Sequence, residues 1–104
     1  MGDDAEIVGE LLKEYLDSAG GLADDLRRHA REALPREVAA VAHKLKSSSR
    51  SIGALGFGDL CAELENVARQ GDAEPLSELV AQFDTAFGGV SDEVHRLLQT
   101  VTGA

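Results

Sequence analysis

The chain has 104 residues, of which 43% are hydrophobic and 28% charged, a composition typical of one soluble globular domain. The net charge of −9 argues against nucleic-acid binding, which requires a basic surface, and against binding to anionic membranes. The single cysteine, Cys61, excludes an internal disulfide and indicates a reducing compartment. No apolar run reaches the roughly 18 residues that cross a bilayer, and the acidic N-terminus is unlike a signal peptide. We therefore expect a cytoplasmic protein or a soluble domain of a larger one.

Apolar residues recur at helical spacing along almost the whole chain, and no segment shows the sustained alternation of a strand. A first stripe covers residues 7–16, and the sequence SAGG at 18–21 is expected to break this helix. A second, weaker stripe covers residues 22–33. The N-terminal third of the chain is thus predicted to contain two helices.

Proline and glycine mark the boundaries of the third helix. Pro35 suits the first turn of a helix, where its missing N–H does no harm. Apolar residues follow at steps of three and four over residues 38–52. Gly53 is expected to end this helix.

Two further stripes complete the chain. One covers residues 57–68 and is ended by the sequence QGD at 70–72. The last covers residues 76–101, with Pro75 in its first turn, and its pair Gly88–Gly89 allows a kink or break.

The fold class predicted from these segments is all-α. Short connections place consecutive helices antiparallel. We expect a single domain over residues 1–104, built as an up-down-up-down antiparallel four-helix bundle with a short additional N-terminal helix.

One histidine lies on the polar side of the third helix. With about 100° per residue, His43 falls opposite the apolar residues Val38 and Leu45, so we expect it to face solvent. A neutral imidazole is a competent nucleophile near neutral pH, and neighbouring cations would hold a phosphoryl group. A plain exposed histidine on a solvated basic face is the alternative. The residues predicted to share its face are small or cationic: Arg36, Ala39, Ala40, Lys46, Ser47 and Arg50.

The sequence AHKLKSSSRSIGALGFGDLCAELE at 42–65 resembles histidine-containing phosphotransfer (HPt) domains. The pattern is a histidine, an apolar residue two positions later, a lysine, a run of small residues and a glycine near the helix end. Here these are His43, Leu45, Lys46, residues 47–49 and Gly53. The helix count and order also match, so the resemblance extends over essentially the whole chain.

The resemblance implies a phosphorelay intermediate. Such a domain accepts a phosphoryl group from the aspartyl phosphate of one receiver domain and passes it to an aspartate of another. His43 would be the phosphoacceptor, and Lys46 would stabilise charge on the phosphoryl oxygens. Glu65 matches a position where some members place a Glu or Gln that hydrogen-bonds the imidazole, with a plain surface carboxylate as the alternative.

The docking surface for the receiver is expected around the histidine. Ser47 stands where the family usually has glycine, which lets the receiver approach closely; serine adds little bulk, so we expect docking to survive. The residues expected on this surface are Ala39, Ala40, Ser47 and Arg50.

The resemblance also implies which partners and cofactors take part. The partners would be response-regulator receiver domains and a hybrid histidine kinase, with the receiver supplying Mg²⁺ and the domain holding no cofactor of its own. No G-x-x-x-x-G-K-[ST] loop is present, so no autonomous kinase activity is expected. A monomer is expected, because the bundle closes its own core. The alternative function is a non-transferring adaptor that binds a receiver or a partner helix; the presence of His43 and Lys46 favours transfer.

The other chemically active side chains are assigned to packing or to the surface. His29 is expected to be partly buried, His95 to lie near the edge of an apolar stripe without a role, and Cys61 to be a small buried residue. The histidines form no His-x-x-x-His or Glu-x-x-His pair, so no helical metal site is predicted.

Overall fold

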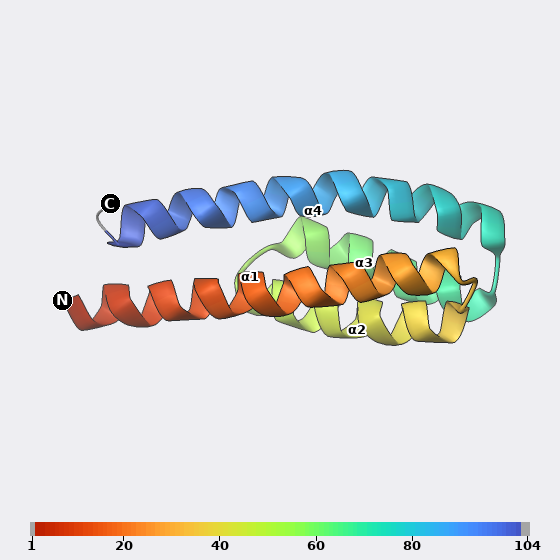
Figure 1. The fold of residues 1–104 in the computed structure, drawn as a ribbon, viewed down its shortest axis with the longest axis horizontal. Helices are drawn as coiled ribbons and strands as arrows, with labels where there is room; N and C mark the ends of the chain where they lie inside the picture. Colours follow the sequence, from red (N-terminus) through yellow and green to blue (C-terminus); the bar gives the residue numbers. More distant parts are fainter. Residues whose placement is uncertain (1, 103–104) are drawn as a thin grey trace.

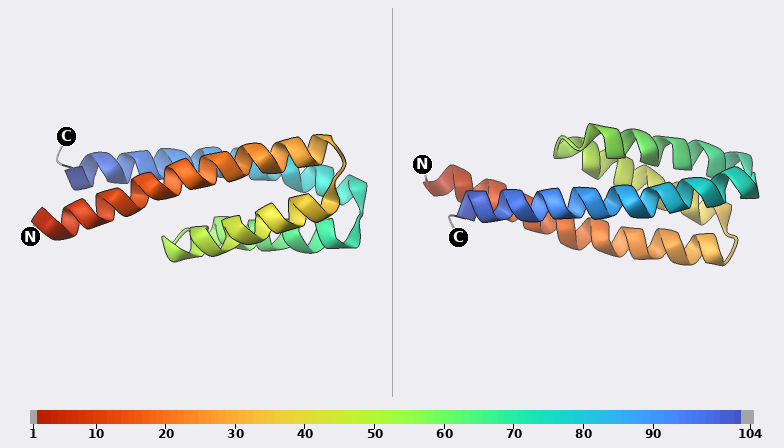
Figure 2. Two further views of the ribbon diagram at one scale, coloured as in Figure 1. Left: turned by 60° about the horizontal axis from the view of Figure 1, so that its bottom comes forward. Right: turned by 90° about the horizontal axis from the view of Figure 1, so that it is seen from above.

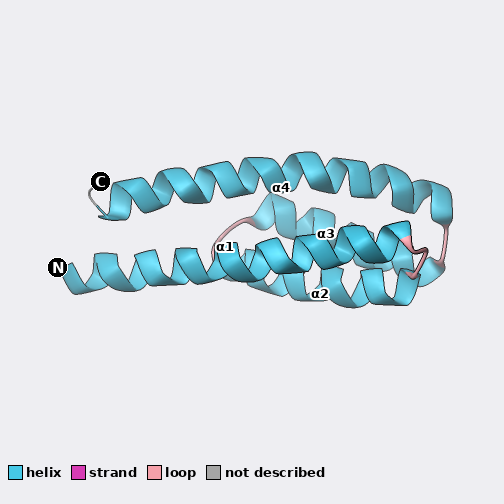
Figure 3. Ribbon diagram, viewed as in Figure 1, coloured by secondary structure: helices cyan, strands magenta, loops and turns pink. Residues whose placement is uncertain are grey.

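The apolar stripes of the sequence form four antiparallel α-helices in a computed structural model, which describes residues 2–102 (Figures 1 and 3). The helices are α1 (Gly2–Arg31), α2 (Pro35–Ser51), α3 (Leu55–Gln70) and α4 (Ala73–Thr102). Short loops join them, and no strand occurs among the described residues. The prediction of an all-α, up-down-up-down four-helix bundle is confirmed. No helix in this part of the chain is long and apolar enough to cross a membrane.

The predicted additional N-terminal helix is wrong, because α1 is continuous from Gly2 to Arg31. The sequence SAGG at 18–21 lies inside this helix. Glycine in a helix costs only about 1 kcal/mol relative to alanine. Here Ala19 and Ala23 are fully buried, so packing against the bundle outweighs the weak local preference. The segment 7–16 is therefore the first half of α1 rather than a separate element.

The glycine pair in the last stripe likewise does not interrupt its helix. Helix α4 runs without a break through Gly88 and Gly89. Phe87 and Val90, on either side of the pair, are half-buried and pack against the core. Continuity of the apolar face again outweighs helix propensity.

The predicted ends of α2 and α3 are confirmed. Pro35 is the first residue of α2. Gly53, with φ of 87°, follows the end of α2, and the next amide, of Ala54, donates to the carbonyl of Ser49 at 2.9 Å. Gly71, with φ of 76°, ends α3. Both glycines adopt the left-handed conformation that closes a helix and that residues with a side chain adopt at a cost.

The core lies along the axis of the bundle and takes side chains from every helix. Leu26, Leu45, Leu64 and Phe83 come from α1 to α4 in turn, and each is fully buried. The rings of Phe83, Phe57 and Phe87 form a cluster with centroid distances of 5.5 to 5.9 Å. Leu, Val, Ala and three Phe residues therefore close the interior without tryptophan.

The helices differ greatly in length, so one pair projects beyond the other at one end of the bundle. We call this difference in length the step. Helices α1 and α4 have 30 residues each, whereas α2 and α3 have 17 and 16. The first part of α1 and the last part of α4 therefore extend side by side past the loop between α2 and α3 (Figures 1 and 2). We refer to residues 2–11 and 91–102 as the arm.

Candidate functional site

His43 lies near the middle of α2 and its side chain is 55% exposed. The opposite face of α2 carries the buried residues Val38 and Leu45, which fix the rotation of the helix. The core residues thus orient the histidine toward solvent, and its predicted exposure is confirmed.

The imidazole of His43 is held by a carboxylate from the neighbouring helix. Its Nδ1 lies 3.1 Å from Oε2 and 3.3 Å from Oε1 of Glu65 on α3. A carboxylate only accepts hydrogen bonds, so Nδ1 carries the proton and donates. In the neutral ring the lone pair is then on Nε2, the nitrogen that is free to act as a nucleophile.

Glu65 lies at the centre of a polar cluster formed with His43, Lys46 and Arg69. Its side chain is only 10% exposed, and it accepts hydrogen bonds from Nζ of Lys46 at 2.9 Å and from Arg69 at 2.7 Å in addition to His43. The hydrogen bond from Lys46 lowers the pKa of Glu65 most; burial opposes it, and His43 adds to the lowering. The carboxyl therefore stays ionised at neutral pH.

Arg69 is a further member of the site that was not predicted from the sequence. It lies four residues after Glu65 on α3, so both side chains share one face of that helix. Acid followed by base at this spacing is a recognisable signal, but it is common on exposed helices. Arg69 belongs to the site only because its partner Glu65 also contacts His43. That contact joins residues 22 positions apart, so the spacing of Glu65 and Arg69 alone does not reveal it.

One predicted surface residue is misplaced. Ala39 is only 5% exposed, so it cannot belong to a docking surface. It lies on the side of α2 that bears Lys46, and this side packs against α3 rather than facing solvent. Ala40 and Ser47 are exposed as expected, on either side of His43 along the helix.

Arg50 is exposed and crosses from α2 to α3. Its guanidinium lies 3.1 Å from Asp59, and its aliphatic part passes over Gly58. A Cβ at position 58 would lie 2.8 Å from Cγ of Arg50, so the absence of a side chain makes room for this crossing. Arg50 thus forms one edge of the surface around His43.

The site thus has an exposed histidine on a helix, a carboxylate that holds it and a lysine three positions later. A comparison with protein-family models agrees with these features. The model of the Hpt domain matches residues 10–101, nearly the whole chain. The chain belongs to the Hpt domain family. Membership supports a histidine phosphotransfer role in phosphorelays, in which Hpt domains interact with receiver domains and histidine kinases. Comparison with curated proteins and with solved structures gives no significant match.

The remaining candidates of this Hpt domain lie outside the cluster. His95 on α4 is exposed, with Nδ1 2.7 Å from the carbonyl oxygen of Ser91. His29 is half-buried and Cys61 is fully buried, both as predicted. Burial raises the pKa of the Cys61 thiol to about 12.

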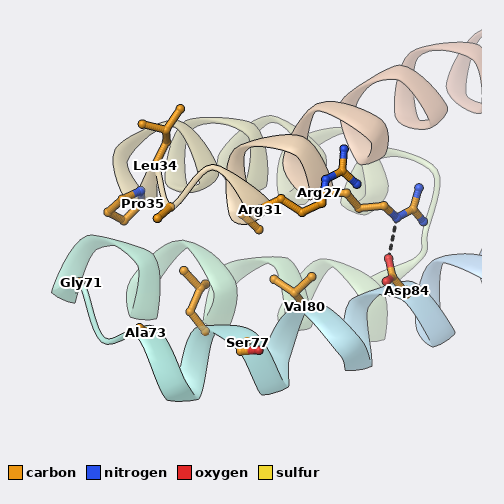
Figure 4. A pocket seen from close by; sticks show the side chains of 12 residues that line it. Arg27, Arg31, Leu34, Pro35, Gly71, Ala73, Ser77, Val80 and Asp84 are labelled. Atoms are coloured by element: carbon orange, nitrogen blue, oxygen red, sulfur yellow. Dashed lines mark hydrogen bonds and ion pairs between the residues drawn. The ribbon is translucent and has the colours of Figure 1, made fainter.

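A hollow at the other end of the Hpt domain from the arm is also separate from His43. It lies between the end of α1 and the start of α4 and has a volume of about 590 Å³ (Figure 4). Arg27 lines it and donates to Asp84 at 2.6 Å, and Leu34 and Val80 are among its other lining residues. Neither His43 nor any of its hydrogen-bonding partners lines this hollow, so it forms no part of the candidate site.

Proposed function

We propose that this Hpt domain accepts a phosphoryl group on Nε2 of His43 from the aspartyl phosphate of one receiver domain and transfers it to an aspartate of another. The observation that carries the proposal is the contact between His43 Nδ1 and Glu65. It fixes the tautomer and holds the ring while leaving the side chain half-exposed for a partner.

The proposed transfer accounts for every bond, electron pair and proton with the groups of His43, Glu65 and the aspartyl phosphate. The lone pair on Nε2 attacks phosphorus, the bond from phosphorus to the aspartate oxygen breaks, and the carboxylate leaves with the electron pair. The proton on Nδ1 stays where it is, so the phosphorylated ring is cationic. Glu65, ionised and 3.1 Å away, stabilises that charge. The onward step reverses this sequence on the second receiver.

We propose that two cations beside Glu65 stabilise the transferred group. Lys46 and Arg69 flank Glu65, so the cluster carries two positive charges against one negative charge. An ammonium group has three donors and a guanidinium five, and each retains donors beyond its bond to Glu65. We assign Lys46 to the phosphoryl oxygens, with Arg69 as a second cation. Phosphoryl transfer depends mainly on this kind of positioning and charge neutralisation.

The surface around the histidine suits a flat partner. Ala40 and Ser47 present small side chains on either side of His43, and Arg50 lies beyond them at the edge. We propose that the receiver docks here and brings the aspartate with its Mg²⁺, so that the domain needs no cofactor of its own. The reaction is assigned to the cytoplasm.

The test is phosphotransfer from a phosphorylated receiver domain in the presence of Mg²⁺. We expect an acid-labile, base-stable phosphate on the protein and none on His43→Gln. The matched control is His95→Gln: His95 is also exposed and its Nδ1 also faces an oxygen, but its partner is a main-chain carbonyl. That variant should be labelled like the wild type.

Label that persists in His43→Gln would contradict the assignment of the phosphoacceptor. If no receiver in a broad panel labels the protein, binding of the same receivers decides the matter. Receivers that bind without transferring phosphate would show the adaptor function instead.

A further inference from the structure

The arm bears an apolar surface that the rest of the bundle leaves open. Large apolar side chains elsewhere are mostly covered, but those on and beside the arm are between 44% and 62% exposed. We call them the arm patch: Ile7, Val8, Leu11, Leu55 and Leu97. Single exposed apolar residues need no explanation, whereas several at the same end of a bundle indicate an interaction site.

The arm patch faces the side from which α2 is missing. Tyr15 contacts α2 through Ser49, with 2.8 Å between the two hydroxyl oxygens. Leu11 and Val8 lie four and seven residues before Tyr15, so they share its helix face. Helix α2 ends at Ser51 and cannot reach them. The same face is therefore buried beside α2 and uncovered on the arm.

A groove continues the arm patch along α4. It has a volume of about 510 Å³ and runs between the loop at 52–56 and α4. Leu12, Phe57 and Val94 line it, and Leu55 and Leu97 stand at its edge. Its lining is mainly apolar and open at the surface, as expected of a seat for a partner's side chains.

The rim of the arm patch is acidic. Asp4 lies four residues before Val8, and Glu10 and Glu14 lie three and seven residues after Ile7, so all three border the patch on α1. Each is exposed. Lys13 lies on the opposite side of α1, and Arg96 on α4 is paired with Glu93.

The negative charge of this rim determines which kind of partner can cover the arm patch. A second copy would place the same acidic rim against itself, in a chain whose net charge is already −9. A partner with lysine or arginine beside an apolar stripe would instead complement both features. The step between α1 and α2, the difference between 30 and 17 residues, is roughly 20 Å long at about 1.5 Å per residue.

We propose that the arm patch docks a basic amphipathic helix of about three to four turns from a partner protein, with its apolar side chains in the groove. None of the residues involved belongs to the cluster around His43. The proposal is thus independent of phosphotransfer, and either can fail without the other.

The experiment uses a fluorescein-labelled 14-residue peptide of leucine and lysine with helical apolar spacing, and a second peptide of the same composition in scrambled order. Binding to the full chain is followed by fluorescence anisotropy. We expect the amphipathic peptide to bind and the scrambled one to bind at least tenfold more weakly, about the factor expected when one or two buried apolar side chains lose their contacts.

Matched variants separate the arm patch from general attraction. Leu11→Ser with Leu97→Ser should weaken binding about tenfold or more. Leu34→Ser, the same chemical change at the other end of the bundle, should leave it unchanged. Asp4→Asn with Glu14→Gln should weaken binding more than Glu32→Gln with Glu78→Gln, which changes the net charge equally away from the arm.

Equal binding of the two peptides, or equal losses in the paired charge variants, would overturn the proposal, because attraction would then come from net charge alone. Sedimentation of the protein without peptide is the remaining measurement. Dimerisation that Leu97→Ser abolishes would overturn it in favour of a second copy. Phosphotransfer by the arm variants should equal that of the wild type.

Discussion

His43 Nδ1 lies 3.1 Å from Glu65 Oε2, across the boundary between α2 and α3. The carboxylate is mostly buried and ionised, so the contact has a direction: nitrogen donates and oxygen accepts. The geometry of two helices thus determines which imidazole nitrogen is available for chemistry.

Replacing Glu65 should alter the tautomer of His43. In Glu65→Ala the Nδ1 proton loses its acceptor, and we expect the ring to populate the Nε2–H form. Transfer should fall roughly tenfold or more, the factor that corresponds to one hydrogen bond to a charged group. Nitrogen-15 NMR of the imidazole measures the tautomer directly. Glu65→Gln keeps an acceptor oxygen and should retain the Nδ1–H form; an unchanged tautomer in Glu65→Ala would remove this role.

Lys46→Met should change how stability depends on pH. Lys46 gives the largest contribution to the lowered pKa of Glu65. A lowered pKa stabilises the fold above the ordinary carboxyl range, and this stability is lost as pH falls through the pKa of the folded state. The free energy of unfolding should therefore differ between wild type and variant at pH 7, and the difference should shrink below about pH 4.5.

Urea titrations at pH 7 and pH 3 measure this difference. Lys44→Met is the matched control, because Lys44 is exposed on the same helix and should show little change at either pH. A difference for Lys46→Met that is the same at both pH values would show that its effect is packing rather than charge.

Much of this structure could be predicted from helical periodicity. The 3.6-residue spacing predicted the apolar faces of the helices and the exposure of His43, and proline and glycine predicted where α2 begins and where α2 and α3 end. Predicting the contact between His43 and Glu65 requires the rotation of α2 and α3 about their axes and their relative position along the bundle. The spacing of residues within one helix specifies neither. For the sequence alone, therefore, the role of Glu65 depended on the resemblance to the family.

The errors have a common physical origin. The prediction for α2 assumed that only one narrow side of the helix is buried. In the structure α2 packs against both α1 and α3. Its buried arc is therefore wider and includes Ala39. It also includes Ser49, which is fully buried and lies 2.8 Å from the hydroxyl of Tyr15 on α1. In the same way, the predicted break at 18–21 followed glycine propensity, which burial of Ala19 outweighs.

The buried hydrogen bond between Tyr15 and Ser49 should contribute measurably to stability. The hydroxyls lie 2.8 Å apart, and both side chains are buried. Ser49→Ala leaves the Tyr15 hydroxyl without this partner and should cost about 1–3 kcal/mol. Tyr15→Phe with Ser49→Ala completes a double-mutant cycle in urea, with an expected coupling energy of about 1 kcal/mol. Additive losses would show that the two hydroxyls act independently.

Ala33→Gly should stabilise the fold. Ala33 follows α1 with φ of 56°, the left-handed conformation that glycine adopts without strain. It is exposed, so the methyl group contributes little packing. We expect a gain of about 0.5–1 kcal/mol in the free energy of unfolding. Ala81→Gly, at an exposed position inside α4, should lose a similar amount, and a loss at both positions would contradict the backbone argument.

Cys61 should be chemically inert in the folded protein. The thiol is fully buried, and burial raises its pKa to about 12, although Arg50 opposes the shift. Only the thiolate reacts with iodoacetamide, so at pH 8 the native rate should be roughly a thousandfold below that of the urea-unfolded chain. Mass spectrometry of timed samples measures both rates. Comparable rates would mean that α3 opens readily, and the same opening would separate Glu65 from His43.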